Sequence, residues 1–90
     1  MATDIITNFD AGSDTFTFSG MSVAGGHIEY VDAGNFAGSG QASAHLQNLA
    51  PGDDLLQIDI DGDGQMTSND MDISLTNLTG TLHNSNFLLT

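Results

Sequence analysis

The sequence predicts a mostly β protein. Short segments in which apolar and polar residues alternate are separated by turns rich in Gly and Asp. No segment shows the apolar spacing of a long amphipathic helix. Because 90 residues suffice for one domain with a small core, we expect residues 1–90 to form a single domain. Its expected architecture is a small β-sandwich of short strands.

The N-terminal part of the chain contains three expected strands and a long loop. The clearest alternation places Phe16 and Phe18 on one face of a strand and threonines on the other. Gly, Ala and Ser dominate residues 32–44, which are expected to form a loop with Phe36 as its hydrophobic anchor. The three strands are expected at residues 4–9, 14–19 and 27–31.

The C-terminal half is expected to contain further strands separated by turns. The segment 42–49 fits either a strand or a short helix, and its pattern leaves both open. Residues 51–53 and 77–81 carry turn signals. Strands are expected at residues 55–60, 71–75 and 87–89.

The charge of the chain is entirely negative. It has eleven Asp, one Glu and no Lys or Arg, so its formal net charge is −12. Such a charge opposes compaction unless cations bind. It also argues against binding to nucleic acid or to an anionic membrane, because no Lys or Arg side chain can neutralise phosphate.

Several classes of site and segment are excluded by composition. The absence of Cys excludes disulfides and thiolate metal sites. No apolar run has the length of a transmembrane helix, so membrane insertion is not expected. The N-terminal residues lack the basic and apolar regions of a Sec signal peptide. The three histidines are far apart in the sequence, and a zinc site is not expected.

One acidic segment has the spacing of a calcium-binding loop. Asp59, Asp61 and Asp63 occupy positions 1, 3 and 5, and glycine follows at position 6, as in an EF-hand loop. Asp70 stands at position 12, where a longer Glu is usual, so weaker or single-oxygen coordination is expected. The alternative is an Asp- and Gly-rich turn between two strands. The candidate Ca²⁺ ligands are Asp59, Asp61, Asp63, Gln65 through its backbone carbonyl, Thr67 and Asp70.

The order of several motifs resembles the C-terminal domain of serralysin-type (peptidase M10) metalloproteases and related RTX calcium-binding proteins. The matching residues are Asp4, Ile6, Asn8-Phe9, Gly12, Asp14, Phe16, Phe18 and Ser19; Phe36-Ala-Gly38-Ser-Gly40-Gln41; Asp59, Gly62, Asp63 and Gly64; Gly80-Thr-Leu82; and Asn86-Phe87-Leu88-Leu89. Asn8 and Asn86 stand where this family has aspartate, and no complete nonapeptide repeat is present. The protease motif H-E-x-x-H is absent, so protease activity does not carry over.

The resemblance implies a non-catalytic, calcium-stabilised module at the end of a larger secreted protein. In that family the module packs on a parallel β-roll, so a β-roll-capping domain of short strands is expected as the alternative to a β-sandwich. The module in that family also carries an uncleaved signal for a type I secretion machine. The implied partners are therefore calcium ions, the secretion machinery and a preceding β-roll, and the implied location is extracellular. A second calcium site, completed by such a β-roll, is expected from Asp4, Asn8, Asp10 and Asp14, with ordinary turn chemistry as an equal alternative.

Two other classes of function stay open at this stage. The acidic loop also resembles that of a dockerin, a calcium-dependent interaction module that has two such loops followed by helices. This chain has one loop followed by a strand pattern. Carboxylate chemistry in an enzyme fragment would need a cleft with two converging aspartates.

Overall fold

The computed structural model describes residues 3–18, 22–32, 34–65 and 70–89 and consists mostly of strands, which confirms the predicted fold class. The elements in chain order are β1 (Thr3–Thr7), β2 (Phe16–Phe18), the 3₁₀ turn η1 (Ala24–Gly26), β3 (Glu29–Tyr30), β4 (Ser43–Ala50), β5 (Asp53–Asp59), β6 (Met71–Thr76), the 3₁₀ turn η2 (Asn84–Asn86) and β7 (Phe87–Leu89). The described part of the chain has no helix of the length and hydrophobicity that a membrane span requires.

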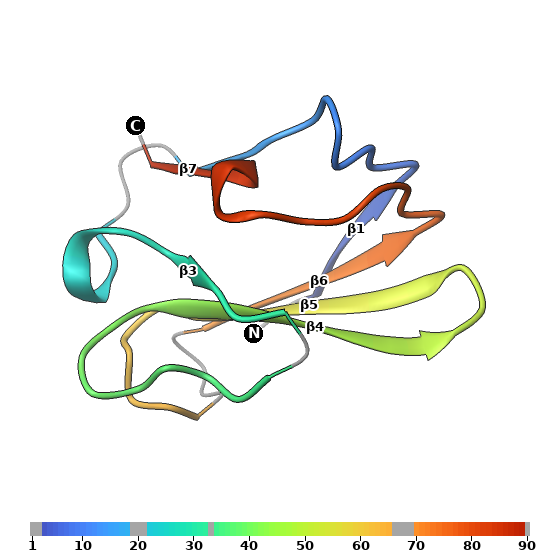
Figure 1. Ribbon diagram of the computed structural model, residues 1–90. Coiled ribbons are helices and arrows are strands. Elements are labelled where there is room, and N and C mark those ends of the chain that lie inside the picture. The colour runs from blue at the N-terminus through green and yellow to red at the C-terminus, as the bar shows by residue number, and fades with distance from the viewer. Residues whose placement is uncertain (1–2, 19–21, 33, 66–69, 90) are drawn as a thin grey trace.

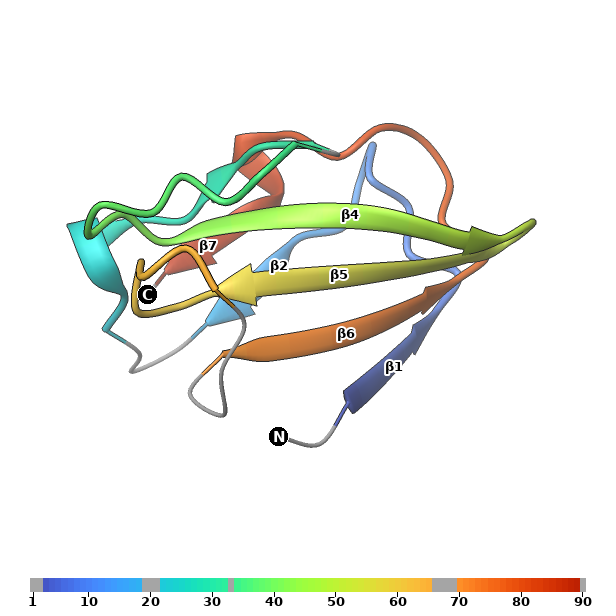
Figure 2. The same cartoon turned by 90° about the horizontal axis from the view of Figure 1, so that it is seen from below.

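The larger layer is a five-stranded sheet in the order β1-β6-β5-β4-β3 (Figures 1 and 2). Its central pairs, β4 with β5 and β5 with β6, are antiparallel hairpins. Its outer pairs, β1 with β6 and β3 with β4, are parallel. The expected strands at 55–60 and 71–75 are therefore neighbours in one hairpin.

The smaller layer is a parallel pair, β2 with β7, that lies across the face of the large sheet (Figure 1). The core between the layers combines sheet residues such as Leu56, Ile58 and Leu75 with aromatic rings from the smaller layer. The Phe16 ring stacks on Phe9 with 4.2 Å between centroids and on Phe87 with 5.3 Å. Two packed layers with a shared core make a small β-sandwich, as expected.

The two ends of the chain form two stacked coils. The first coil, residues 3–18, passes from β1 in one layer to β2 in the other, and the second coil, residues 71–89, passes from β6 to β7 in the same way. Asn8 and Asn77 lie at equivalent corners with φ of 62° and 59°. The Asn77 side-chain amide donates to Asn8 Oδ1 at 3.4 Å. Residues 22–65 lie between the two coils in sequence and supply β3, β4 and β5.

The first three strands are shorter than the sequence-based expectation, and for two of them the structure gives a local reason. The first strand ends at Thr7 rather than at residue 9, because the positive φ of Asn8 turns the chain. The second starts at Phe16 rather than at Asp14, because Asp14 closes a turn by donating its backbone N–H to the Asp10 carbonyl at 2.7 Å. The third covers only Glu29–Tyr30.

The segment 42–49, which the pattern left open, forms most of a strand. Residues 43–50 pair with β5 along their length, and Ser43 and Ala44 are fully buried. Pairing on both sides of β4 decides in favour of a strand, because it satisfies backbone groups that a short helix would leave exposed.

Candidate metal centre

The acidic loop, residues 59–70, connects β5 to β6 at one end of the large sheet. The last ladder pair of the hairpin is Ile58 with Met71, so the loop leaves and rejoins the sheet at neighbouring strands. Gly62 and Gly64 have φ of 71° and 82°, a region that side chains disfavour. These glycines allow the tight coil that the sequence pattern required at this place.

The loop brings four carboxylates together. Each of Asp59, Asp61, Asp63 and Asp70 offers one oxygen atom, and these four atoms lie within 4.8 Å of one another. Asp59 and Asp70 are fully buried, whereas Asp61 and Asp63 are exposed. In the described ranges, this is the one group of three or more Asp, Glu, His or Cys side chains with such spacing.

Backbone N–H groups hold these carboxylates in place. Gly64 N–H donates to Asp59 Oδ2 and Ile60 N–H donates to Asp70 Oδ1, both at 2.8 Å. On the exposed side, Gln65 N–H donates to Asp63 Oδ1 at 2.9 Å. These bonds close the loop on itself and turn its carboxylates toward a common centre.

One oxygen of the cluster is left without any partner among the described residues. Asp59 Oδ1 is buried and receives no hydrogen bond. A buried carboxylate oxygen without a donor is costly, because the water that would solvate it has been removed. A metal cation bound by the four carboxylates would remove this cost.

The electrostatics of Asp59 reflect the same crowding. Burial raises the pKa of the Asp59 carboxyl to about 6, and the neighbouring carboxyls of Asp61, Asp70 and Asp63 add to the rise. The hydrogen bond from Gly64 opposes it. The chain has no Lys or Arg side chain that could compensate these charges. Four carboxylates are the ligand type of a hard cation such as Ca²⁺.

Four of the six predicted ligands thus lie together. Gln65 is exposed at the end of the same turn, with its backbone N–H directed to Asp63. Thr67 lies outside the described residues, and its role stays a prediction.

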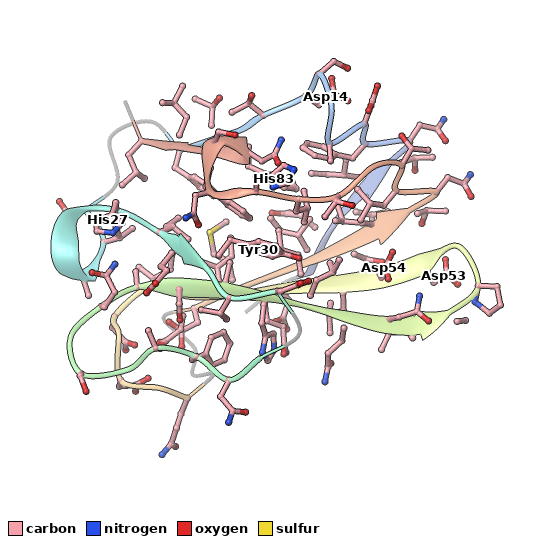
Figure 3. The ribbon with its side chains drawn as sticks, in the orientation of Figure 1. Asp14, His27, Tyr30, Asp53, Asp54 and His83 are labelled. Atoms are coloured by element: carbon pink, nitrogen blue, oxygen red, sulfur yellow. The ribbon has the colours of Figure 1, made fainter. Side chains whose placement is uncertain are left out.

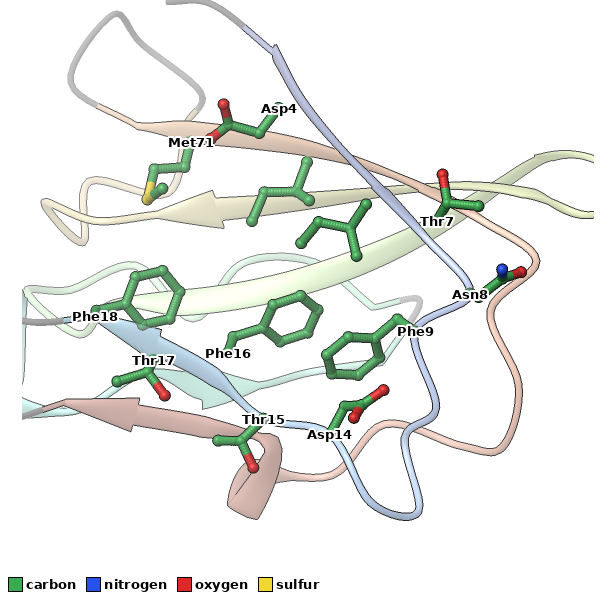
Figure 4. A pocket seen from close by; sticks show the side chains of 12 residues that line it. Asp4, Thr7, Asn8, Phe9, Asp14, Thr15, Phe16, Thr17, Phe18 and Met71 are labelled. Atoms are coloured by element: carbon green, nitrogen blue, oxygen red, sulfur yellow. The ribbon is translucent and has the colours of Figure 1, made fainter.

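The second predicted set, Asp4, Asn8, Asp10 and Asp14, is arranged differently. Asp10 and Asp14 form one turn, in which Asp14 Oδ2 accepts from Asp10 N–H at 2.8 Å. Hydrogen bonds from Gly12 N–H and from the Ser13 hydroxyl lower the pKa of Asp10. Asp4 on β1 and Asp14 in the turn before β2 line one groove, and the two are well apart in Figure 4. A calcium site here stays a prediction.

The histidines are held in separate places. His45 lies on β4, with Nε2 2.7 Å from Gln57 Oε1 and its ring stacked on Phe36 at 4.3 Å. His27 and His83 lie beside different turns (Figure 3). Figure 3 also shows that Asp53 and Asp54 lie near the far tip of the β4–β5 hairpin.

Sequence reasoning missed the segment that supports the acidic loop. Gly40 N–H donates to the Gly62 carbonyl at 3.0 Å, and Gly38 lies 3.7 Å from the place where a Cβ on Gly64 would be. The sequence signal is the Gly- and Gln-containing segment 36–41, whose composition by itself predicts only a loop.

The fold and this site define a class of protein, a small β-sandwich module with an acidic loop that could hold a metal ion. A family model described as Peptidase M10 serralysin C terminal matches residues 1–89. The chain therefore belongs to the serralysin C-terminal family, whose members are non-catalytic modules of secreted proteins, separate from the catalytic domain. A search of curated proteins and a search of solved structures gave no match.

Proposed function

We propose that this chain is a calcium-binding, non-catalytic terminal module whose folding is linked to the ion. The observation that carries the proposal is the buried Oδ1 of Asp59, which has no partner among the described residues and belongs to a group of four carboxylates. A turn without a metal-binding role would not need to bury two aspartates beside two more. Asp59, Asp61, Asp63 and Asp70 would hold the ion, with the Gln65 carbonyl and Thr67 as the further proposed ligands.

The mechanism is thermodynamic linkage. In the calcium-free chain the four carboxylates repel one another, so closing the loop costs free energy. Calcium binds the closed loop and not the open chain, so its binding free energy adds to the folding free energy. Extracellular calcium modules bind with dissociation constants on the order of 10⁻⁴–10⁻³ M. The module would be loosely folded where calcium is scarce and stable where it is abundant.

Thermal unfolding in chelator, in calcium and in magnesium tests this proposal. Calcium should raise the melting temperature, and magnesium should do so less, because Mg²⁺ demands a stricter octahedral geometry and dehydrates reluctantly. The double variant Asp61→Ala with Asp63→Ala should lose the calcium response. A wild-type melting temperature that is the same in chelator and in calcium would refute the linkage.

We also propose that the first coil accepts the last coil of a preceding β-roll. The edges of β1 and β2 border an open groove of about 520 Å³. Figure 4 shows the rings of Phe9, Phe16 and Phe18 in a row along this groove, between the two layers. Within the chain, the first coil stacks on the second coil, and their strands pair in parallel register. One more coil of the same geometry would cover the groove and pair both open edges.

A longer chain that includes the residues preceding this module would test the stacking. Covering the groove should reduce binding of an apolar fluorescent dye and should slow amide exchange in β1. Equal dye binding and equal exchange in the short and long chains would contradict it.

Export by a type I machine is the third part of the proposal. Its support is membership of a family of secreted proteins, together with a sequence that lacks Lys and Arg. Fusing the module to a reporter in cells with and without a type I exporter measures this directly. Reporter export that does not depend on the exporter would rule it out.

The dockerin-like alternative has less support, because strands rather than helices flank the acidic loop.

A further inference from the structure

The segment Gly38–Gln41 and the acidic loop are in direct backbone contact. Gly40 N–H donates to the carbonyl of Gly62 at 3.0 Å. A Cβ added to Gly62 would lie 2.7 Å from the backbone nitrogen of Gln41 and 2.8 Å from the carbonyl carbon of Gly40. No side chain larger than hydrogen fits at Gly62 without a shift of this backbone.

The side chain of Gln41 ties this contact to a third segment, the η1 turn. Its amide nitrogen donates to the His27 carbonyl at 2.8 Å and to the Ala42 carbonyl at 3.0 Å. The turn passes directly over this amide, because a Cβ on Gly25 would collide with Gln41 Oε1 and would lie 2.8 Å from its Cδ. Gln41 therefore fixes the position of η1 through hydrogen bonds and through contact.

The η1 turn also binds Ile60, the residue between Asp59 and Asp61. Ala24 N–H donates to the Ile60 carbonyl at 3.0 Å, and Ala42 N–H donates to the Ala24 carbonyl at 2.9 Å. Ile60 N–H is the donor to Asp70 Oδ1. A set of hydrogen bonds thus links the Gln41 amide through η1 to the carbonyl of Ile60, the residue whose own N–H donates to Asp70.

We propose that Gln41 is a positioning residue for the cation site, acting through η1 on Ile60, the residue that follows Asp59 and donates its N–H to Asp70. This inference rests on the proposed calcium function and extends it to a side chain that belongs to no carboxylate cluster. Gln41 sets how completely the carboxylates surround the ion, and so sets both its affinity and the number of waters that it keeps. Partners of this kind typically change metal affinity by about 10-fold or more.

Two adjacent glycines of η1 provide a matched test. Gly25 and Gly26 have φ of 78° and 81°, so replacement by Ala strains the backbone equally at both. Only the Cβ at Gly25 meets Gln41, since a Cβ at Gly26 has nothing within 4 Å. Calcium affinity is measured by calorimetry, and the lifetime of bound Tb³⁺ luminescence in H₂O and D₂O counts the waters on the ion. Gly25→Ala should bind calcium about 10-fold more weakly than Gly26→Ala and should keep more waters on Tb³⁺.

A second pair removes the hydrogen bonds instead of displacing them. Gln41→Met keeps the side-chain length and deletes both donors, and Gln47→Met makes the same change at an exposed position of β4. Gln41→Met should reproduce the weaker affinity and the higher water count, and Gln47→Met should match the wild type. Melting temperatures in chelator are recorded for all four variants to separate folding from binding.

These measurements can refute the role of Gln41 separately from calcium binding. A wild-type chain that binds neither calcium nor terbium refutes both. Binding by the wild type, with equal affinity and equal water counts in the two members of each pair, overturns the role of Gln41 alone. Unfolding of both Gly25→Ala and Gln41→Met in saturating calcium would also overturn it, because Gln41 would then serve the fold and not the site.

Discussion

Replacing Asp59 by Asn should stabilise the calcium-free protein and remove its response to calcium. The ionised Asp59 is unfavourable in the folded chain, because its buried Oδ1 has no donor among the described residues and because the carboxyls of Asp61, Asp63 and Asp70 lie close to it. Asn is nearly isosteric, carries no charge, and its carbonyl oxygen can still accept from Gly64 N–H, the donor to Asp59 Oδ2. The same change deletes a charged ligand from the centre of the cluster.

The size of the effect follows from the pKa. A rise from 3.8 to about 6 corresponds to about 3 kcal/mol of cost for the ionised carboxylate at neutral pH, at 1.36 kcal/mol per unit. Solvent reaches the exposed Asp61 and Asp63 and screens part of this interaction, so we expect a gain of about 1–2 kcal/mol in chelator. For a domain of this length, that is a rise in melting temperature of about 4–16 °C.

Calcium should reverse the order of stability. With a dissociation constant of about 10⁻⁴–10⁻³ M, about 10 mM calcium adds roughly 1.4–2.7 kcal/mol to the wild type. Asp59→Asn should gain almost none of this. Urea unfolding in chelator and in calcium, followed by circular dichroism, measures both numbers. Asp53→Asn, the same change at an exposed position of the β4–β5 hairpin, is the control and should change little in either buffer. A variant less stable than the wild type in chelator would refute the reasoning, as would an unchanged gain from calcium.

Three further predictions concern pH, a backbone contact and the core. The folded pKa of Asp59 lies above its ordinary value, so its contribution to calcium-free stability is fully present below about pH 4 and is lost as pH rises through about 6. The melting temperature in chelator should therefore fall over this interval, and a rise would contradict the prediction. Gly62→Ala should cost more than about 1 kcal/mol beyond Gly40→Ala in urea unfolding, because only the Cβ at Gly62 meets backbone atoms; equal losses would disprove the contact. Phe16→Ala should cost about 3–5 kcal/mol, since its buried ring stacks on two others; a loss below about 1 kcal/mol would show that the two layers do not depend on it.

The strands and the acidic loop could be predicted from the sequence because their signals are local. Alternation identified β6, and the spacing of Asp59, Asp61 and Asp63 placed the cluster between two strands, where the structure has it. The parallel pairing of β1 with β6 could not be predicted in this way, because it joins residues about seventy positions apart. The tripeptides Thr7-Asn-Phe and Thr76-Asn-Leu were a usable signal, since the register places them side by side.

The role of Gln41 was beyond sequence reasoning for a different reason. Its amide donates hydrogen bonds to the backbone carbonyls of His27 and Ala42. Every residue has a backbone carbonyl, so the sequence does not indicate which of them accepts such a bond. The collision that makes Gly25 and Gly62 necessary also appears only when three separate segments have been folded together. Such contacts between separate segments require the folded structure, and their only trace in the sequence is the presence of glycines.

The two stacked coils also fix the order of events during folding. The strands of the first coil, β1 and β2, have as their only described ladder partners β6 and β7, which come from the last nineteen described residues. The central hairpins can form as soon as their own residues are available, whereas β1 and β2 must wait for β6 and β7 at the other end of the module. A partly synthesised or partly threaded chain therefore cannot complete this sandwich. Shortening the chain before Phe87 should leave β2 without its ladder partner β7, however intact the acidic loop is.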